Sequence, residues 1–327
     1  MLVSTSVETK RNLILNTLAD GRFHSGQELG DKLGISRAAV GKHVQALQTL
    51  GLEIFSVTGK GYRLSNKLDL LNTETIRQHI ARTSGPPLVV LSVVNSTNTY
   101  LKEHEQLHVK GAACLAEAQT SGRGRQGRPW ISPFGASLYL SMYWRFEGGY
   151  QMLGGLSLAV GVAIATALEE SGVQGLSLKW PNDVYLHGKK LGGILVEVEG
   201  QINDTSHCIM GIGINVELPE SQQSRIDQPW ADLASQMNEK PDRNKLSGKL
   251  LTSLYNALEK FEQTGLKAFL EPWSRLHLHQ GKRVRMICGP NNFEGECLGI
   301  NAEGALLISL PGGTKAFYGG EVSVRAL

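Results

Sequence analysis

Cysteine is scarce in this chain of 327 residues, which contains only Cys114, Cys208, Cys288 and Cys297. No two of them form a CxxC pair, and none belongs to a Cys/His cluster with zinc-ligand spacing. The sequence therefore argues against a disulfide framework and against a structural metal site. Sparse, unpatterned cysteine is typical of proteins in a reducing compartment.

Long apolar runs are also lacking. The longest run, Leu153 to Leu168, is short for a membrane span and contains three glycines, so a buried helix is the favoured interpretation. The start of the chain, as far as Arg11, is polar and lacks the apolar core of a signal peptide. We therefore expect a soluble, cytoplasmic protein with no membrane partner.

Neither sign of charge dominates, because 33 Lys and Arg face 30 Asp and Glu, which gives a net charge of +3. The whole molecule is not a polycation, so any nucleic-acid surface must be local. Residues 1–67 are the more basic part, with nine Lys or Arg against five Asp or Glu.

This basic segment has the pattern of a winged helix-turn-helix. A first helix is predicted from about Glu8 to Ala19. Ser25 and Ser36 are good N-caps for a second and a third helix, and Gly34 suits the tight turn between them. A strand from Leu52 to Val57, a Gly-rich turn and a short returning strand then predict the wing.

A linker at residues 65–72 leads into a segment in which strand and helix patterns alternate. Helices are predicted from Ser96, over Met152–Ser171 and over Arg243–Thr264, between strands at Leu88–Val94, Gly111–Ala118, Ala136–Phe146, Leu176–Lys179, Leu191–Val198 and Cys208–Val216. This mixture indicates a mixed α/β or α+β sheet. Four short strand candidates near the C-terminus predict a small β-barrel. The expected domains are therefore residues 1–66, 67–273 and 274–327.

A loop rich in glycine and arginine extends from Ser121 to Arg128. Glycine lets the backbone approach a ligand and present N–H groups to an anion, and arginine supplies planar forks for phosphate and carboxylate. Neither a Walker loop nor a dinucleotide-binding GxGxxG motif places arginine between glycines. On these residues alone, a phosphate-binding loop and a basic surface loop are about equally good interpretations. Trp130, just beyond, offers an aromatic face for a base.

Two further motifs predict charged groups at strand ends. Residues 179–183, KWPND, present a cation, an amide and a carboxylate, and such a carboxylate can hold Mg²⁺ beside substrate phosphates. Residues 190–194, KLGGI, place an ammonium where it can neutralise a carboxylate and the phosphate it attacks. The alternatives are an Asn-Asp turn that bonds its own backbone and a solvated lysine.

Small polar groups complete the candidate site. Residues 95–98, NSTN, stand at a strand-to-helix junction that suits a polar head group, although simple N-capping by Ser96 is the alternative. The glycines of residues 211–215, GIGIN, open space for a ligand or another backbone. No Ser/His/Asp arrangement and no nucleophilic cysteine motif is evident. These residue types indicate a site that orients reactants and stabilises phosphate charge without a covalent enzyme intermediate.

In this order, the motifs STN at 96–98, GRGR at 122–125, KWPND and KLGGI strongly resemble those of biotin–protein ligases. With a winged helix in front of them, the chain resembles the bifunctional bacterial type, which is both biotin operon repressor and biotin–[acetyl-CoA-carboxylase] ligase. The resemblance extends over essentially the whole chain. It implies an α+β multidomain protein with a winged helix-turn-helix, a central mixed α/β catalytic domain like that of class II synthetases, and a C-terminal SH3-like β-barrel.

The resemblance also implies a two-step reaction. The carboxylate of biotin attacks the α-phosphate of ATP to give biotinyl-5′-AMP and pyrophosphate, with Mg²⁺ present, and a lysine of the biotin carboxyl carrier protein then displaces AMP. The implied catalytic residues are Lys190, Asp183 and Arg125, with Asp183 also the Mg²⁺ ligand. The implied contacts to biotin come from Ser96, Thr97, Asn98, Gln119, Arg123, Gly124, Arg125, Lys190 and Gly211. Those to ATP or the adenylate come from Arg123, Arg125, Arg128, Trp130, Lys179, Asn182, Lys190 and Asn215.

In the winged helix, the implied partner is biotin operator DNA. The candidate contacts are Ser36, Arg37, Lys42 and His43 around the third helix and Lys60 and Arg63 on the wing. A protein-interaction module is the alternative use of such a domain. Because a repressor that reads an inverted repeat must dimerise, the resemblance implies a homodimer when the adenylate is bound, with biotinyl-5′-AMP as corepressor.

One position departs from the resemblance, because Gln126 stands where the best-known ligase of this type has an arginine. A neutral side chain there puts the role of that position in doubt. Two rival functions stay open. A lipoate ligase would share the catalytic fold, although the Gly/Arg loop and the winged helix disfavour it. A repressor that senses biotin without catalysis would release no pyrophosphate from ATP.

Overall fold

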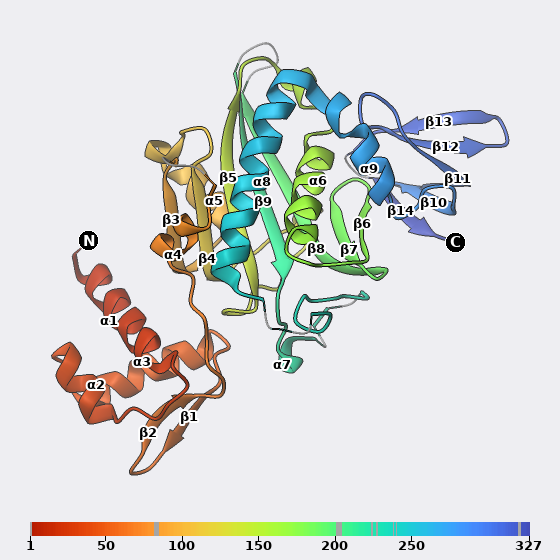
Figure 1. The fold of residues 1–327 in the computed structure, drawn as a ribbon. Coiled ribbons are helices and arrows are strands. Elements are labelled where there is room, and N and C mark those ends of the chain that lie inside the picture. The colour runs from red at the N-terminus through yellow and green to blue at the C-terminus, as the bar shows by residue number, and fades with distance from the viewer. Residues whose placement is uncertain are drawn as a thin grey trace.

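The computed structural model describes residues 2–81, 85–200, 205–223, 225–226, 228–237, 239, 241–319 and 322–327. The N-terminal part is a winged helix-turn-helix, shown in red and orange in Figure 1. Its elements are α1 (Leu2–Leu18), α2 (Gly26–Leu33), α3 (Arg37–Thr49), β1 (Ile54–Val57) and β2 (Gly61–Leu64). The predicted order is confirmed, although α1 begins before the predicted start at Glu8.

The turn between α2 and α3 depends on two glycines. Ser25 and Ser36 cap the two helices as predicted, and Gly34 has a φ of 63°. The second glycine, Gly30, is one that the sequence did not indicate. Its carbonyl accepts a 3.0 Å hydrogen bond from the Ile35 N–H. A Cβ at Gly30 would lie 2.6 Å from the Ile35 carbonyl oxygen, so only glycine lets α2 approach the turn this closely.

The central part is built on a seven-stranded sheet in the order β3-β4-β5-β9-β8-β7-β6. β3 and β4 are parallel, and every other neighbouring pair is antiparallel. The strands are β3 (Leu88–Val94), β4 (Ala113–Gln119), β5 (Ser137–Phe146), β6 (Leu176–Lys179), β7 (Asp183–Leu186), β8 (Lys189–Gly200) and β9 (Ser206–Asn215). The sheet is therefore mixed, as predicted, and β7 is a strand that the sequence did not indicate.

Helices cover both faces of this sheet. α6 (Leu156–Glu169) and α8 (Arg243–Thr264) lie together over one face, and α5 (Thr97–Glu103) packs against β4, β5 and β9 from the other (Figure 1). The apolar run that includes α6 is a buried helix, as expected. No helix in the described ranges is long and apolar enough to cross a membrane. The smaller helical elements are α4 (Thr73–Gln78), α7 (Glu220–Gln223), α9 (Leu270–Leu276), η1 (Glu105–Leu107), η2 (Arg125–Gly127), η3 (Tyr150–Leu153) and η4 (Gly265–Phe269).

The C-terminal part is an antiparallel five-stranded sheet in the order β13-β12-β11-β10-β14. Its strands are β10 (Arg283–Cys288), β11 (Asn291–Ile300), β12 (Leu306–Leu310), β13 (Gly313–Phe317) and β14 (Val322–Ala326). β14 is additional to the four predicted strands. The boundary expected between residues 273 and 274 falls inside α9, and the buried Trp180 indole donates to the Gly304 carbonyl at 3.0 Å, so this sheet is tied to the central part.

The linker between the winged helix and the central part is fixed at residues 68–72, which we call the linker strap. The Leu68 N–H donates to the Ala19 carbonyl of the winged helix at 3.0 Å. One residue further along, the Asp69 carbonyl accepts a hydrogen bond from the Arg243 guanidinium at 2.6 Å. The Asn244 side chain donates to the Leu70 carbonyl at 3.0 Å. The strap therefore joins the two parts through successive backbone groups.

A buried ion pair forms hydrogen bonds with the backbone of the linker strap. Arg243 of α8 and Glu117 of β4 are 2.7 Å apart, with side chains only 3% and 4% exposed. The other oxygen of Glu117 accepts a hydrogen bond from the Leu71 N–H. Both charges are thus partnered by each other and by backbone groups of the strap, which is how a buried pair becomes tolerable.

Candidate functional site

The N-terminus of α5 meets the end of β4 and the middle of β5 and β9 in a buried polar cluster. The side-chain oxygen of Gln119 accepts from the Thr97 N–H at 2.9 Å. The Ser141 hydroxyl lies 2.7 Å from Thr97 Oγ1 and 2.5 Å from Asn98 Oδ1. Ser96 is the N-cap of α5, so the simple capping role is real. The cluster nevertheless goes beyond capping, because Thr97 and Asn98 are 3% exposed and bond to three strands of the sheet.

Two glycines of β9 make room for the groups that face them. A Cβ at Gly211 would lie 2.4 Å from Asn98 Oδ1. A Cβ at Gly213 would lie 2.7 Å from the indole of Trp130. The glycines in this strand do open space, as predicted, but the groups that face them are one side-chain amide and one aromatic ring rather than another backbone.

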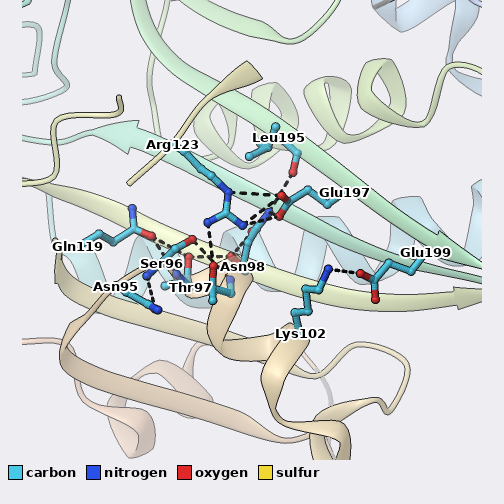
Figure 2. A network of polar contacts seen from close by, with 12 residues as sticks. Asn95, Ser96, Thr97, Asn98, Lys102, Gln119, Arg123, Leu195, Glu197 and Glu199 are labelled. Carbon is cyan, nitrogen blue, oxygen red and sulfur yellow. Dashed lines mark hydrogen bonds and ion pairs between the residues drawn. The ribbon is translucent and has the colours of Figure 1, made fainter. Parts of the chain in front are cut away.

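The first arginine of the Gly/Arg loop is directed towards α5 and β8. Arg123 places its guanidinium 3.1 and 3.2 Å from the two carboxylate oxygens of Glu197, and it donates to Thr99 Oγ1 at 2.7 Å. The side-chain amide of Asn98 donates to the same carboxylate at 2.7 Å. Figure 2 shows Arg123 and Asn98 converging on Glu197 from different elements.

The second arginine of the loop is directed towards the KWPND motif. Arg125 donates to Asn182 Oδ1 at 3.0 Å, and the amide of Asn182 donates to the Ile194 carbonyl at 2.8 Å. Burial lowers the pKa of Arg125 from its ordinary value, and the nearby Asp183 opposes this effect. The guanidinium nevertheless stays charged near neutral pH, because the ordinary pKa of arginine is so high. The loop is therefore in contact with the motif that follows it by more than fifty positions in the sequence.

Lys190, Asp183 and Trp130 form the centre of the site. Lys190 Nζ lies 2.9 Å from Asp183 Oδ1, with side chains 16% and 19% exposed, and 5.6 Å from the centre of the Trp130 ring. A Cβ at Gly193 would be 3.5 Å from that ring and 3.6 Å from Asp183, so glycine leaves the centre open. A cation, a carboxylate and an aromatic face thus meet beside backbone that a ligand can approach.

Lys179 lies at the edge of this centre. Burial lowers the pKa of Lys179, Asp183 opposes that effect, and Lys190 and Arg325 add to it. The ammonium is 3.4 Å from the Tyr185 hydroxyl, and burial raises the pKa of Tyr185 to about 12. Lys179 therefore supplies a second positive charge close to Lys190, as expected of a site for a polyanion.

The rest of the predicted ligand set is less engaged with the site. Arg128 is exposed and donates to Gln126 Oε1 at 3.3 Å. Gln126 itself has a left-handed φ of 57°, which is unusual for a residue other than glycine. Asn215 is buried and donates to the Ala231 carbonyl at 3.0 Å. Gly124 lies between Arg123 and Arg125, and its N–H donates to the Arg128 carbonyl at 2.8 Å.

Sequence reasoning missed Glu197 and Ser141. Glu197 alternates with apolar residues in the run LVEVEG, which reads as an ordinary solvent-facing strand position. Ser141 is flanked on both sides by three apolar or aromatic residues of β5, within the run LYLSMYW. A buried hydroxyl in an apolar strand is the signal that could have drawn attention to Ser141, whereas nothing in the sequence pointed to Glu197.

The predicted DNA-contacting residues lie on one domain but differ in exposure. Arg37 and Lys42 of α3 and Lys60 of the wing are exposed. His43 is partly buried, and burial together with Lys10 and Arg11 lowers its pKa, so it stays neutral near pH 7. Arg63 stacks its guanidinium 5.0 Å from the ring centre of Phe23 and 5.3 Å from that of Phe55, and Ser36 is the N-cap of α3.

Three family models match consecutive parts of the chain. The HTH domain model matches residues 10–63, the Biotin/lipoate A/B protein ligase family model matches residues 90–215, and the Biotin protein ligase C terminal domain model matches residues 279–325.

Similar proteins match nearly the whole chain. The Bifunctional ligase/repressor BirA of Salmonella typhimurium is 44% identical over 313 residues, covering 96% of this chain and 97% of that protein. The protein of the same name from Bacillus subtilis is 31% identical over 319 residues, covering 96% and 98%. A solved structure, the biotin protein ligase from Aquifex aeolicus in complex with biotin and ATP, superposes with a TM-score of 0.64 at 33% identity and covers 74% of this chain and 99% of that one.

Proposed function

Since this chain belongs to the biotin protein ligase family, we propose that it is a biotin–[acetyl-CoA-carboxylase] ligase and biotin operon repressor in one polypeptide. The observation that carries the ligase proposal is the convergence of Arg125, Asn182, Asp183, Lys190 and Trp130 on the open backbone at the centre of the site. Positive charge, an aromatic face and glycine backbone are what a carboxylate and a nucleoside triphosphate need in order to react side by side.

In the first step, an oxygen of the biotin carboxylate attacks the α-phosphorus of ATP, and the bond to the bridging oxygen of pyrophosphate breaks. Ser96, Thr97, Asn98, Gln119, Arg123, Gly124 and Gly211 are proposed to hold biotin. Lys190 and Arg125 would lie against the reacting carboxylate and phosphate, where their charges lower the repulsion between two anions. Trp130 would stack on adenine, and Arg123, Arg128, Lys179, Asn182 and Asn215 would support ATP or the adenylate.

In the second step, a lysine amine of the biotin carboxyl carrier protein attacks the carbonyl carbon of biotinyl-5′-AMP, and AMP leaves. The amine must lose a proton, and Asp183 is the proposed acceptor. The Asp183 carboxylate is 2.9 Å from Lys190 Nζ. When it accepts the proton of the carrier lysine, that lysine would take the place of Lys190 as its partner.

Mg²⁺ is proposed to accompany ATP. This ion usually keeps several waters and binds one or two carboxylates together with substrate phosphates. Asp183 fits as such a carboxylate, because it stands beside the two lysines that would meet the phosphates. When bound, the ion would neutralise the charge that builds up on the leaving pyrophosphate.

The ligase proposal is tested by incubating the protein with ATP, Mg²⁺, biotin and a carrier domain, and then measuring the intact mass of the carrier. We expect addition of one biotinyl group and release of pyrophosphate. The matched reaction with lipoate separates the rival lipoate ligase, and transfer of lipoate but not biotin would refute the proposal. Biotin and DNA binding without pyrophosphate release would instead indicate a repressor without catalysis.

The repressor proposal rests on the winged helix and its exposed basic residues. We propose that Arg37 and Lys42 contact DNA from α3, with Ser36 and His43 beside them, and that Lys60 and Arg63 reach phosphates from the wing. The active form would be a homodimer that biotinyl-5′-AMP stabilises by pairing the two catalytic sheets. Operator binding measured against salt concentration tests this, since Lys42→Ala should reduce the slope of log K against log[salt] by about 0.9 if Lys42 neutralises one phosphate.

The finer structural assignments belong to the same proposal. We propose domain limits at residues 1–66, 67–273 and 274–327, a class II synthetase-like catalytic domain, an SH3-like C-terminal barrel and action in the cytoplasm. Limited proteolysis followed by mass spectrometry would locate the limits, because cleavage concentrates in segments that few contacts cross.

A further inference from the structure

Glu197 is a carboxylate on β8 that joins two groups from different parts of the proposed site. One is the guanidinium of Arg123 in the Gly/Arg loop, which approaches both of its oxygens within 3.2 Å. The other is the side-chain amide of Asn98 at the start of α5, which donates to it at 2.7 Å. Neither partner is close to Glu197 in the sequence, so this contact exists only in the folded chain.

The contact fixes the orientation of both partners. The amide of Asn98 could point either way, but its oxygen accepts from Ser141 at 2.5 Å and its nitrogen donates to Glu197. The guanidinium of Arg123 is a planar fork, and it is held on one side by the carboxylate and on the other by Thr99 Oγ1 at 2.7 Å. An arginine with two such partners loses most of its rotamer freedom before any ligand arrives.

We propose that Glu197 is a positioning residue for biotin, which holds Asn98 and the Gly/Arg loop in the arrangement that receives the head group and the carboxylate of biotin. The inference rests on the proposed ligase function and deepens it. Glu197 would act through Arg123 and Asn98, which Figure 2 shows in contact with it, and not on the reacting atoms themselves. With both groups already oriented, less entropy is lost when biotin binds.

The same strand provides a matched control. Glu199 lies two residues further along β8 on the same face, and it pairs with the exposed Lys102 of α5. Its side chain is 53% exposed, against 37% for Glu197, and it bonds to none of the proposed ligand residues in the described part of the chain. Replacing Glu199 therefore removes a carboxylate and an ion pair from β8 without touching the biotin site.

The experiment compares Glu197→Ala, Glu197→Gln and Glu199→Ala in the full chain. Pyrophosphate release gives KM for biotin, KM for ATP and kcat. We expect Glu197→Ala to raise KM for biotin roughly tenfold, since charge-assisted hydrogen bonds to two positioned groups are lost. KM for ATP should rise less than KM for biotin, because only Arg123 of the two positioned groups is also assigned to the adenylate, and kcat should stay close to that of the unchanged protein. Glu197→Gln keeps an acceptor for Asn98 but loses the charge, so it should fall in between, and Glu199→Ala should change KM by less than about twofold.

A second readout needs no catalysis. Trypsin cleaves after arginine, and in this structure Arg123 is held by Glu197 and Thr99. Glu197→Ala should therefore be cut faster within residues 121–128 than Glu199→Ala or the unchanged protein. Peptide mass mapping identifies the cut.

Several results would overturn the proposal. If Glu197→Ala behaves like Glu199→Ala in both readouts, Glu197 is no more than a surface ion pair. Equal rises of KM for biotin and for ATP, or a fall in kcat alone, would show that it does not position biotin. If the unchanged protein releases no pyrophosphate with biotin, both the proposed function and this inference are wrong. If it releases pyrophosphate normally and the Glu197 variants do not differ from it, the inference alone is refuted.

Discussion

Replacing Arg243 by methionine should destabilise the protein strongly, because it leaves a carboxylate buried without its partner. Arg243 and Glu117 are 2.7 Å apart with side chains 3% and 4% exposed, and the arginine also donates to the Asp69 carbonyl. Removing one member of a buried pair typically costs about 3–5 kcal/mol, most of it the penalty of the remaining charge. Methionine fills a similar volume, so little of the loss would come from a cavity.

Urea unfolding followed by circular dichroism measures this loss. The control is Arg275→Met, which breaks an exposed Arg–Glu pair with two contacts of 3.0 Å to Glu169. The side chains of that pair are 54% and 36% exposed, so we expect a change of about 0–1 kcal/mol. A double variant, Glu117→Leu with Arg243→Met, should recover part of the stability, since no buried charge remains.

The reasoning would be refuted if Arg243→Met cost no more than Arg275→Met. It would also be refuted if the double variant were less stable than Arg243→Met alone. A second observable is cleavage by trypsin after Lys67, whose side chain is 76% exposed. Loss of Arg243 should speed this cut, because the linker strap then loses its anchor at the Asp69 carbonyl.

Three further outcomes are expected. Gly211→Ala would place a Cβ 2.4 Å from Asn98 Oδ1, so biotin binding measured by calorimetry should weaken by about 1–3 kcal/mol, whereas Gly312→Ala, with no neighbour within 4 Å, should leave it unchanged. Arg125→Gly removes the contact to Asn182 and should let the adenylate escape; unchanged labelling of bystander lysines would contradict the proposed role of Arg125 in holding the adenylate. Burial lowers the pKa of His279 to about 4, so as pH falls from about 6.5 to 4 the unfolded chain takes up a proton that the folded chain does not. Stability should therefore fall across that window, by up to about 3 kcal/mol, and the urea midpoint of His279→Phe should vary less with pH; an equally steep profile would contradict the assignment.

Much of the secondary structure was predictable because its signals are local. The predicted helix Arg243–Thr264 has the observed bounds of α8, since Asp242 caps its start and Gly265 ends it. The predicted strand Leu176–Lys179 likewise has the bounds of β6. α4 and α9 were missed because six- and seven-residue helices carry little periodicity. β7 was missed because the Asn-Asp pair at its start, whose aspartate is the first residue of the strand, suggested a turn.

The candidate site was predictable in its motifs but not in its contacts. Residue types alone indicated that the Gly/Arg loop, KWPND and KLGGI belong to one site. In the structure Arg125 contacts Asn182, and Lys190 contacts Asp183. Glu197 could not be found this way, because its partners Arg123 and Asn98 lie 74 and 99 positions away. Long-range side-chain pairing depends on sheet register, which one sequence does not fix when the strands are apolar on both faces.

The linker strap has a consequence for how the winged helix is carried. Its last backbone hydrogen bond to that domain is made by the Leu68 N–H, and its first hydrogen bond to the central part is accepted by the Asp69 carbonyl. Consecutive residues therefore bond to the two parts, with no flexible tether between them. A flexible tether would let the DNA-reading helix α3 sample many directions, and that freedom would have to be lost at each encounter with DNA. Here the loss occurs once, when the chain folds. The orientation of α3 is therefore fixed relative to the central part of the protein.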